Sequence, residues 1–212
     1  MKGNARAIIA EAQTQLQDVE GVRWSAGELV EYLNEGQRMI VSARPSESAR
    51  SEAFQVVDGP RQPLPEYATL LLDAHHNSSP RQRALTKVER HTLETVARDW
   101  MSMQPSEATI HYMYSDLEPR AFYVYPPAIA GSHLQVTFSV YPEDVATPTG
   151  PTAASVTGNT GLESRWDTAL LDYVLFRAWS KDAEYAANEQ RAASHLGLFT
   201  TSVSVQATPA KT

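Results

Sequence analysis

The stretch from Trp166 to Asn188 is the feature that most constrains the fold, because its apolar residues surround most of a helix. These residues are Leu170, Leu171, Tyr173, Val174, Leu175, Phe176, Ala178 and Trp179. A helix that is apolar nearly all round has to be buried among other helices, since one apolar stripe is enough for a surface helix. The rest of the chain must therefore supply helices that cover this one.

The first 44 residues predict two such helices. The first carries one apolar stripe at steps of three and four residues, made of Ile8, Ile9, Ala12, Leu16 and Val19. The second begins at Ser25, a capping residue followed three positions later by Glu28, with Trp24 placed to pack on Leu29. Its Gly36, at an otherwise apolar position, predicts the close approach of another backbone, and Pro45 ends the helix.

The middle of the chain changes to strand patterns. From Ser51 the apolar period falls from near four to two, and three strands are expected at residues 108–114, 121–125 and 133–141. The pair Pro126-Pro127 should lie outside the sheet, because proline cannot donate a ladder hydrogen bond. Residues 146–161 are rich in Pro, Gly, Thr, Ala and Ser without periodicity, which predicts a flexible loop.

These patterns predict an α+β fold in which both chain ends form one antiparallel helical bundle. The bundle comprises residues 1–45 and 162–200, and a small, mainly antiparallel β-domain at 50–145 is inserted between them. Residues 146–161 form the flexible loop, and residues 201–212 form a tail. We expect a soluble protein, because no apolar run approaches the roughly 20 residues that cross a bilayer.

Composition excludes several classes of function. The chain has no cysteine, which removes disulfides, thiolate metal sites and a thiol nucleophile. Its 25 acidic and 18 basic residues give a net charge of −7. Because phosphate contacts need Lys and Arg, DNA binding is not expected as the main function.

The strongest enzyme-like cluster is Asp73 with His75 and His76, which could hold a divalent metal in a small hydrolase. We favour a surface loop there, since no second group with metal-ligand spacing is present. The meander is rich in aromatic residues, which are more typical of a core and cross-strand pairs than of a ligand surface. We expect no catalytic, cofactor-binding or metal-binding residues. The alternative function is a tail-associated carbohydrate-binding module that uses the aromatic meander, with Tyr123 and Tyr125 at its centre.

Asp172 and Arg177 lie within the most apolar part of the C-terminal helix, where an unpaired charge is costly. They either pair inside the bundle or point toward a neighbouring subunit. The sequence leaves both possibilities open, so both residues are candidate interface residues.

Three segments resemble one family. They are Trp24–Arg38 (W-S-x-x-E-L followed by L-N-E-G-Q-R), Phe122–Pro127 (F-Y-V-Y-P-P) and Leu170–Tyr185 (L-L-D-Y-V-L-F-R-A-W-S-K-D-A-E-Y). In this order they resemble bacteriophage head-to-tail adaptor, or connector, proteins of the tail tubular protein A type found in short-tailed phages.

The resemblance implies a structural virion protein with no enzyme activity and no cofactor. It implies a ring of copies, commonly twelve, that docks on the portal protein, carries the downstream tail or nozzle protein and lines the DNA exit channel. DNA would pass without specific binding, and no membrane would be involved. The protein would be made in the host bacterial cytoplasm and reside in the virion neck. By the same resemblance, Val203 and Val205 in the tail are expected to be disordered in the free chain and to dock on the portal.

Overall fold

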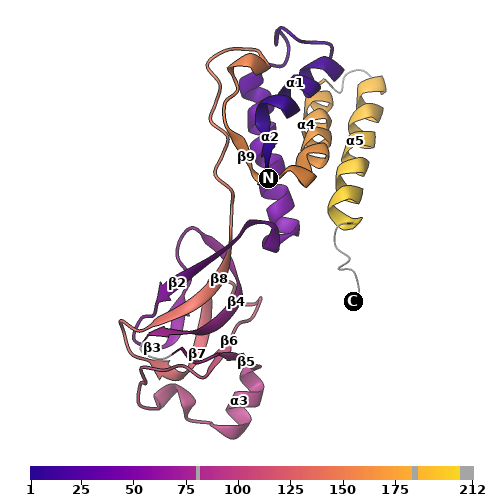
Figure 1. Cartoon of the computed structure of the whole chain (residues 1–212). Coiled ribbons are helices and arrows are strands. Elements are labelled where there is room, and N and C mark those ends of the chain that lie inside the picture. The colour runs from indigo at the N-terminus through magenta and orange to yellow at the C-terminus, as the bar shows by residue number, and fades with distance from the viewer. Residues whose placement is uncertain (80–81, 183–185, 206–212) are drawn as a thin grey trace. The chain divides into compact units, whose positions relative to one another are not determined.

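The computed structural model describes residues 1–79, 82–182 and 186–205. The chain divides into two compact units. The helical unit combines Met1–Glu47 with Pro142–Thr212, and the β unit is Ser48–Tyr141 (Figure 1). Each unit has its own apolar core.

The helical unit is built around α4 (Asp167–Lys181), which packs against α1, α2 and α5. Around it lie α1 (Ala5–Gln15), α2 (Ala26–Ala43) and α5 (Ala186–Val205), the last alongside α4 (Figure 1). Short 3-10 helices lie at Pro45–Ser48, Ala153–Ser155 and Ser164–Trp166, and β1 (Lys2–Asn4) pairs antiparallel with β9 (Asn159–Glu163).

The start of α2 follows the expected capping chemistry. Ser25 is the N-cap, and its side chain accepts a hydrogen bond from the backbone N–H of Glu28 at 3.3 Å. Gly36 does allow a close approach, although by a side chain: a Cβ at this position would lie 3.0 Å from Cδ1 of Tyr173 on α4. The absence of a Cβ therefore lets the Tyr173 ring of the buried helix lie directly on α2.

Three buried amide side chains attach residues 145–161 to α1 and α2. Asn34 exchanges two hydrogen bonds with the backbone of Val145, at 2.8 and 3.0 Å. Gln13 donates to the carbonyl of Pro151 at 3.0 Å and accepts from the N–H of Ala153 at 2.9 Å. Gln37 accepts from the backbone N–H of Gly161 at 2.6 Å.

The segment 146–161, predicted to be a flexible loop, is thus packed onto the helices and contains a 3-10 helix and part of β9. Val145, Ala153 and Val156 contribute buried side chains to the core of the helical unit. Composition did not reveal this, because the segment takes its hydrogen bonds from side chains distant in sequence and has little regular structure of its own.

The β unit contains two sheets that share one core. One sheet has the antiparallel order β2 (Ala49–Gln55), β8 (His133–Val140), β4 (Ala68–Ser79). The other has the order β3 (Gly59–Pro63), β7 (Ala121–Ala128), β6 (His111–Met113), β5 (Thr86–Lys87), with only β5 and β6 parallel. Between β5 and β6 lie α3 (Arg90–Val96) and a 3-10 helix at Trp100–Ser102.

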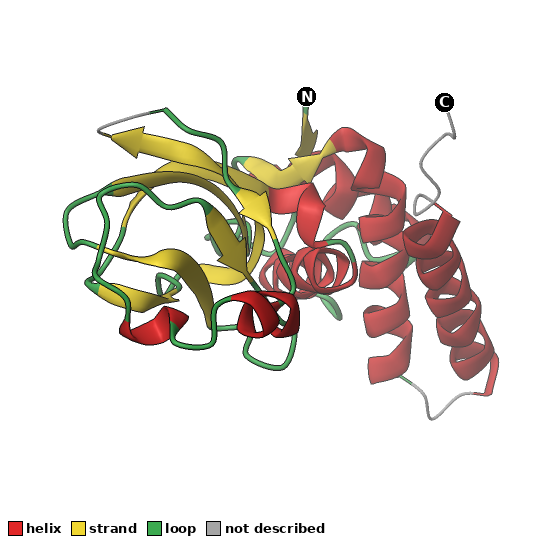
Figure 2. Ribbon diagram, turned by 90° about the horizontal axis from the view of Figure 1, so that it is seen from below, coloured by secondary structure: helices red, strands yellow, loops and turns green. Residues whose placement is uncertain are grey.

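Seen from below, the strands curve around this core, which includes Phe122, Leu134 and Phe138 (Figure 2).

Strand β7 continues through Pro126 and Pro127, which were expected outside the sheet. The register with β3 shifts in this region, since Tyr123 pairs with Arg61 and Ala128 pairs with Gly59. The pairing with β6 ends at Tyr125. The two prolines therefore lie where no regular ladder bond is required of their missing N–H groups.

The fold class predicted from the periodicity is wrong. The described residues form a mixed α+β structure with five helices and three sheets of two to four strands, rather than a helical bundle with a small inserted β-domain. The strand content was underestimated because β1 and β9 are short and polar, and β3 contains two prolines. Such segments become strands through partners distant in sequence, and an apolar period does not reveal those partners. Within the described residues, no helix is both long and apolar enough to cross a bilayer.

Gly21 tests the packing of residues 145–161 on the α1–α2 connection. Its φ is +65°, and an added Cβ would lie 2.1 Å from the carbonyl oxygen of Pro151. Gly21→Ala should lower the free energy of unfolding of the helical unit by about 2 to 4 kcal/mol, through backbone strain and overpacking together. Urea unfolding followed by tryptophan fluorescence measures this.

Gly158→Ala is the matched control. Its φ is +86°, but no atom lies within 4 Å of the added Cβ. Gly158→Ala should lower the free energy of unfolding only through backbone strain, by about 1 kcal/mol. Equal losses for the two variants would contradict the contact with Pro151.

Asn34 tests the amide connections themselves. Asn34→Leu is close in volume but leaves both backbone groups of Val145 without partners in the core. The loss in unfolding free energy should be about 2 to 4 kcal/mol, measured by the same urea unfolding. As a control, replacing the exposed Asn159 by Leu should change the free energy of unfolding by about 0.5 kcal/mol or less. A loss of that size for Asn34→Leu would show that residues 145–161 are held by other contacts.

Candidate functional site

The charged candidate interface residues on α4 are paired inside the helical unit. Oδ1 of Asp172 lies 2.9 Å from Nδ1 of His195 on α5. Arg177 forms an ion pair with Glu35 on α2, and its guanidinium carbon lies 4.9 Å from the centre of the Tyr32 ring. Both residues thus have partners within the helical unit, and their place at an interface between subunits stays a prediction.

The other two candidates lie at the end of α5. Val203 is in the helix with its side chain buried in the core of the helical unit. Arg44, which follows α2, donates from Nε to the Val203 carbonyl at 2.9 Å and from Nη2 to the Ser204 carbonyl at 3.0 Å. The described part of the helix extends to Val205, within the segment 201–212 that was expected to be a tail. The side chain of Val205 and residues 206–212 lie outside the described residues.

The metal-like cluster lies within strand β4 and not in a surface loop. Asp73 accepts a hydrogen bond from the Tyr112 hydroxyl at 2.6 Å, and Nδ1 of His75 lies 3.3 Å from the other Asp73 oxygen. Burial, followed by the hydrogen bond to Asp73, raises the pKa of Tyr112 to about 12. Among the described residues, no group of three or more His, Asp or Glu side chains could hold a metal ion. Through the hydrogen bond from Tyr112 on β6, the Asp73 side chain on β4 links strands of two different sheets.

The aromatic side chains proposed for carbohydrate binding pack against neighbouring side chains of the β unit. The guanidinium carbon of Arg90 lies 5.0 Å from the centre of the Tyr123 ring, and the His111 ring stacks on Tyr125 with an interplanar angle of 16°. Phe122 and Phe138 are fully buried. A sugar would need a free aromatic face, and Arg90 already covers one face of Tyr123.

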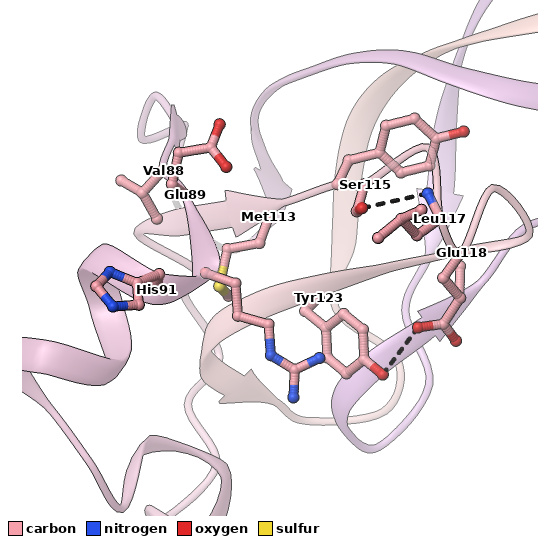
Figure 3. Close-up of a pocket in the computed structure, with 11 residues that line it drawn as sticks. Val88, Glu89, His91, Met113, Ser115, Leu117, Glu118 and Tyr123 are labelled. Atoms are coloured by element: carbon pink, nitrogen blue, oxygen red, sulfur yellow. Dashed lines mark hydrogen bonds between the residues drawn. The ribbon is translucent and has the colours of Figure 1, made fainter.

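The β unit has a recess of about 320 Å³ between α3, β6, β7 and the turn before β7. Figure 3 shows Met113 and Tyr123 at its centre, with Leu117 and Glu118 on one side and Glu89 and His91 on the other. Met113 is buried, whereas Leu117 on the rim is 97% exposed.

The turn that carries Leu117 is fixed by hydrogen bonds. Ser115 accepts from the N–H of Leu117 at 3.3 Å, and Tyr114 donates to the carbonyl of Pro119 at 3.1 Å. Glu118 pairs with Arg61, and this hydrogen bond holds the pKa of Glu118 below its usual range. The recess thus combines the buried side chain of Met113 with a rim on which Glu118 is already paired with Arg61.

A second ordered turn joins α1 to α2, and sequence reasoning missed it. The carboxylate of Asp18 accepts hydrogen bonds from the backbone N–H groups of Val22 at 2.9 Å, Arg23 at 2.8 Å and Trp24 at 2.8 Å. Val22 is 88% exposed and Val19 is 61% exposed. An Asp shortly before Gly21 is a turn signal that could have indicated this arrangement. The turn holds two apolar side chains in solvent in a fixed geometry.

The pH dependence of stability tests the Asp18 turn. Burial raises the pKa of Asp18, but the hydrogen bonds from Trp24, Val22 and Arg23 outweigh it, and the net pKa lies below the ordinary 3.8. A lowered carboxyl pKa stabilises the fold above the unfolded-state value, and this contribution is lost as the pH falls through the folded-state value. Asp18→Asn should therefore destabilise the protein at pH 6, and the difference from wild type should shrink below about pH 3.8.

Urea unfolding at several pH values measures this difference, and Glu20→Gln, on the same turn, is the control. A constant difference between wild type and Asp18→Asn across this pH range would refute the role assigned to the carboxylate.

Comparison with known families gives the wider context for these surfaces. No curated protein matches the chain. The family model described as SU10 adaptor protein matches residues 4–211, which include both structural units. Adaptors of this kind are structural proteins of the phage particle that interact with its other components. The chain therefore belongs to the SU10 adaptor protein family and is a structural adaptor protein of a bacteriophage virion.

Proposed function

We propose that this adaptor docks as a ring of twelve copies on the portal protein in the virion neck. The ring connects the portal to the downstream tail or nozzle protein and lines the channel through which DNA leaves the capsid. Within the adaptors, we assign the chain to the tail tubular protein A type of short-tailed phages, from the three sequence segments that resemble it.

Family membership is the observation that carries this proposal. The match to the SU10 adaptor family spans residues 4–211, so it covers nearly all of both units. A role in assembly also agrees with the chemistry of the described residues. Their most enzyme-like groups, Asp73 and His75, are engaged in hydrogen bonds between strands.

The charge of the chain supports passage of DNA without binding. The net charge is −7, and phosphate groups are repelled by an excess of carboxylates. A channel lined by such a protein lets a duplex slide, whereas a basic lining would retain it.

The fixed turns support a role in docking. Leu117 and Val22 are 97% and 88% exposed, and both lie on turns that are held by hydrogen bonds. Apolar side chains held in one geometry lose little conformational freedom when a partner covers them, which favours binding.

We also propose the C-terminal end of α5, with residues 206–212, as a portal contact. Val203 is part of the core and Arg44 holds its carbonyl, so removing residues 201–212 would damage the helical unit as well. Deletion of residues 206–212 alone leaves the described helix intact and should abolish portal binding. Retention of wild-type portal binding by this deletion would remove the C-terminal contact from the proposal.

Native mass spectrometry of the full chain mixed with the portal ring of the same phage tests the main proposal. A discrete mass increase equal to twelve added copies is expected. If portal and adaptor are each folded and no complex forms, the portal-docking role is wrong. A complex with another number of copies would retain docking and overturn the twelvefold ring.

A further inference from the structure

Four of the described strands in the β unit lie at sheet edges, and three of these edges are protected against further pairing. Strand β3 contains Pro60 and Pro63, which have no N–H to donate, and β5 is only two residues long. Strand β4 pairs irregularly with β8, and part of its outer edge is already bonded to residues 83–85. Prolines, short strands and bulges are the devices by which natural proteins keep edges from pairing with other chains.

The fourth edge strand, β2, has none of these devices. It is seven residues long, contains no proline and pairs with β8 in one unbroken register (Figure 1). Its two charged residues neutralise each other, since Nε of Arg50 lies 2.9 Å from Oε2 of Glu52. Both side chains also contact Tyr67, through its ring and its hydroxyl respectively. The edge of β2 is therefore regular and carries no net charge.

The hydrogen bonds of Val56 show which backbone groups of β2 point away from β8. Its N–H donates to the Ser132 carbonyl at 3.0 Å, and its carbonyl accepts from the N–H of Gly131 at 3.4 Å. Along an antiparallel pair, residues bonded to the partner strand alternate with residues that are not. The residues of β2 whose N–H and C=O groups point to the free edge are Ala49, Ser51, Ala53 and Gln55.

The side chains agree with this alternation, and the edge is open to solvent. Oγ of Ser51 lies 2.7 Å from Oγ1 of Thr137, as expected for a non-hydrogen-bonded pair, in which side chains approach most closely. All four residues with outward-pointing backbone groups are exposed. Among the described strands, only β8 pairs with β2. The β unit has two residues outside the described ranges, 80 and 81, which are too few to pair along a strand of seven.

We infer that β2 receives an extended segment of a different virion protein, which adds a strand to the β2–β8–β4 sheet. A row of outward N–H and C=O groups is matched by another extended backbone, and strand addition to a sheet edge is a common mode of protein recognition. A second copy of the chain fits less well. The other edges of its β unit are protected, and β2 paired with β2 would close two copies into a two-fold dimer instead of a ring. This choice of occupant rests on the proposed function.

Phe54 indicates what the added segment should contain. Its ring is half-buried, 5.7 Å from the ring centre of Phe122 and 5.8 Å from that of Phe138. Because Phe54 is bonded to β8, it would form a non-hydrogen-bonded pair with an added antiparallel strand, where side chains are closest. We therefore expect an apolar residue opposite Phe54. The small side chains of Ser51 and Ala53, on the other face, leave room for large residues of the segment.

Hydrogen–deuterium exchange of the free full-length chain and of purified phage particles tests whether the edge is paired. The outward amides of Ser51, Ala53 and Gln55 should exchange at least about tenfold more slowly in the particle than in the free chain. The amides of Arg50 and Phe54, which face β8, are the internal control and should be protected in both. Unchanged exchange of the outward amides in the particle would overturn the inference.

Ala53→Pro tests the pairing itself, because it removes an outward N–H without removing a bond to β8. Supplied to a phage that lacks its own adaptor gene, this variant should lower the yield of infectious particles by about tenfold or more. Ala53→Ser keeps the N–H and should give the wild-type yield. Circular dichroism establishes that each purified variant is folded, and Gln55→Pro replaces Ala53→Pro if the latter is not. A wild-type yield from a folded proline variant would contradict strand addition.

Cross-linking identifies the occupant. Gln55→Cys introduces a single cysteine into a chain that has none, so a photoreactive maleimide labels only this edge. In phage particles the label should cross-link to an extended segment of a different virion protein. Cross-links to β2 of a second copy, to residues 206–212 of the chain or to DNA would each overturn the proposed occupant. The complex with the portal is weighed separately, so failure of portal docking and failure of strand addition at β2 are distinguishable.

Discussion

The helical unit depends on three buried amides, Gln13, Asn34 and Gln37, which interrupt the apolar faces of α1 and α2. Buried backbone N–H and C=O groups must find partners, and a segment without regular secondary structure cannot supply all of its own. The amides provide partners for residues 145–161 and in that way attach this segment to α1 and α2. A segment of low complexity thereby becomes part of a packed core.

The need of buried polar groups for partners also explains how the two charged residues on α4 are accommodated. This helix is surrounded by α1, α2 and α5, and a lone charge in such a position would be costly. Asp172 and Arg177 are satisfied by His195 and Glu35, which come from the two flanking helices. Each pair thus links α4 to a helix that packs against it.

The chemistry of the described residues is directed to holding surfaces in place. Asp18 organises one turn through three backbone N–H groups, and hydrogen bonds around Ser115 organise another. Both turns display exposed apolar side chains, Val22 and Leu117. Apolar side chains held in one geometry lose little conformational freedom when a partner covers them, which is the basis of the docking role proposed above. Asp73 illustrates the same tendency, since its carboxylate joins β4 to Tyr112 of the other sheet.

The sequence by itself determined what depends on near neighbours: the Ser25 cap, the close approach at Gly36, the burial of α4, and the adaptor motifs that the family match supports. It failed where a residue's role depends on a distant partner. Residues 146–161 were predicted to be flexible because the amides that bind the backbone of residues 145–161, on Gln13, Asn34 and Gln37, lie more than 100 positions away. Asp73 was predicted to lie in a loop, because the apolar pattern of β4 ends there. The pairing of β4 with β8 nevertheless continues beyond it. Local preference fixes caps and buried faces, whereas hydrogen-bond partners distant along the chain exist only after the chain has folded, so the tertiary structure alone decided the sheets and the packing of residues 146–161.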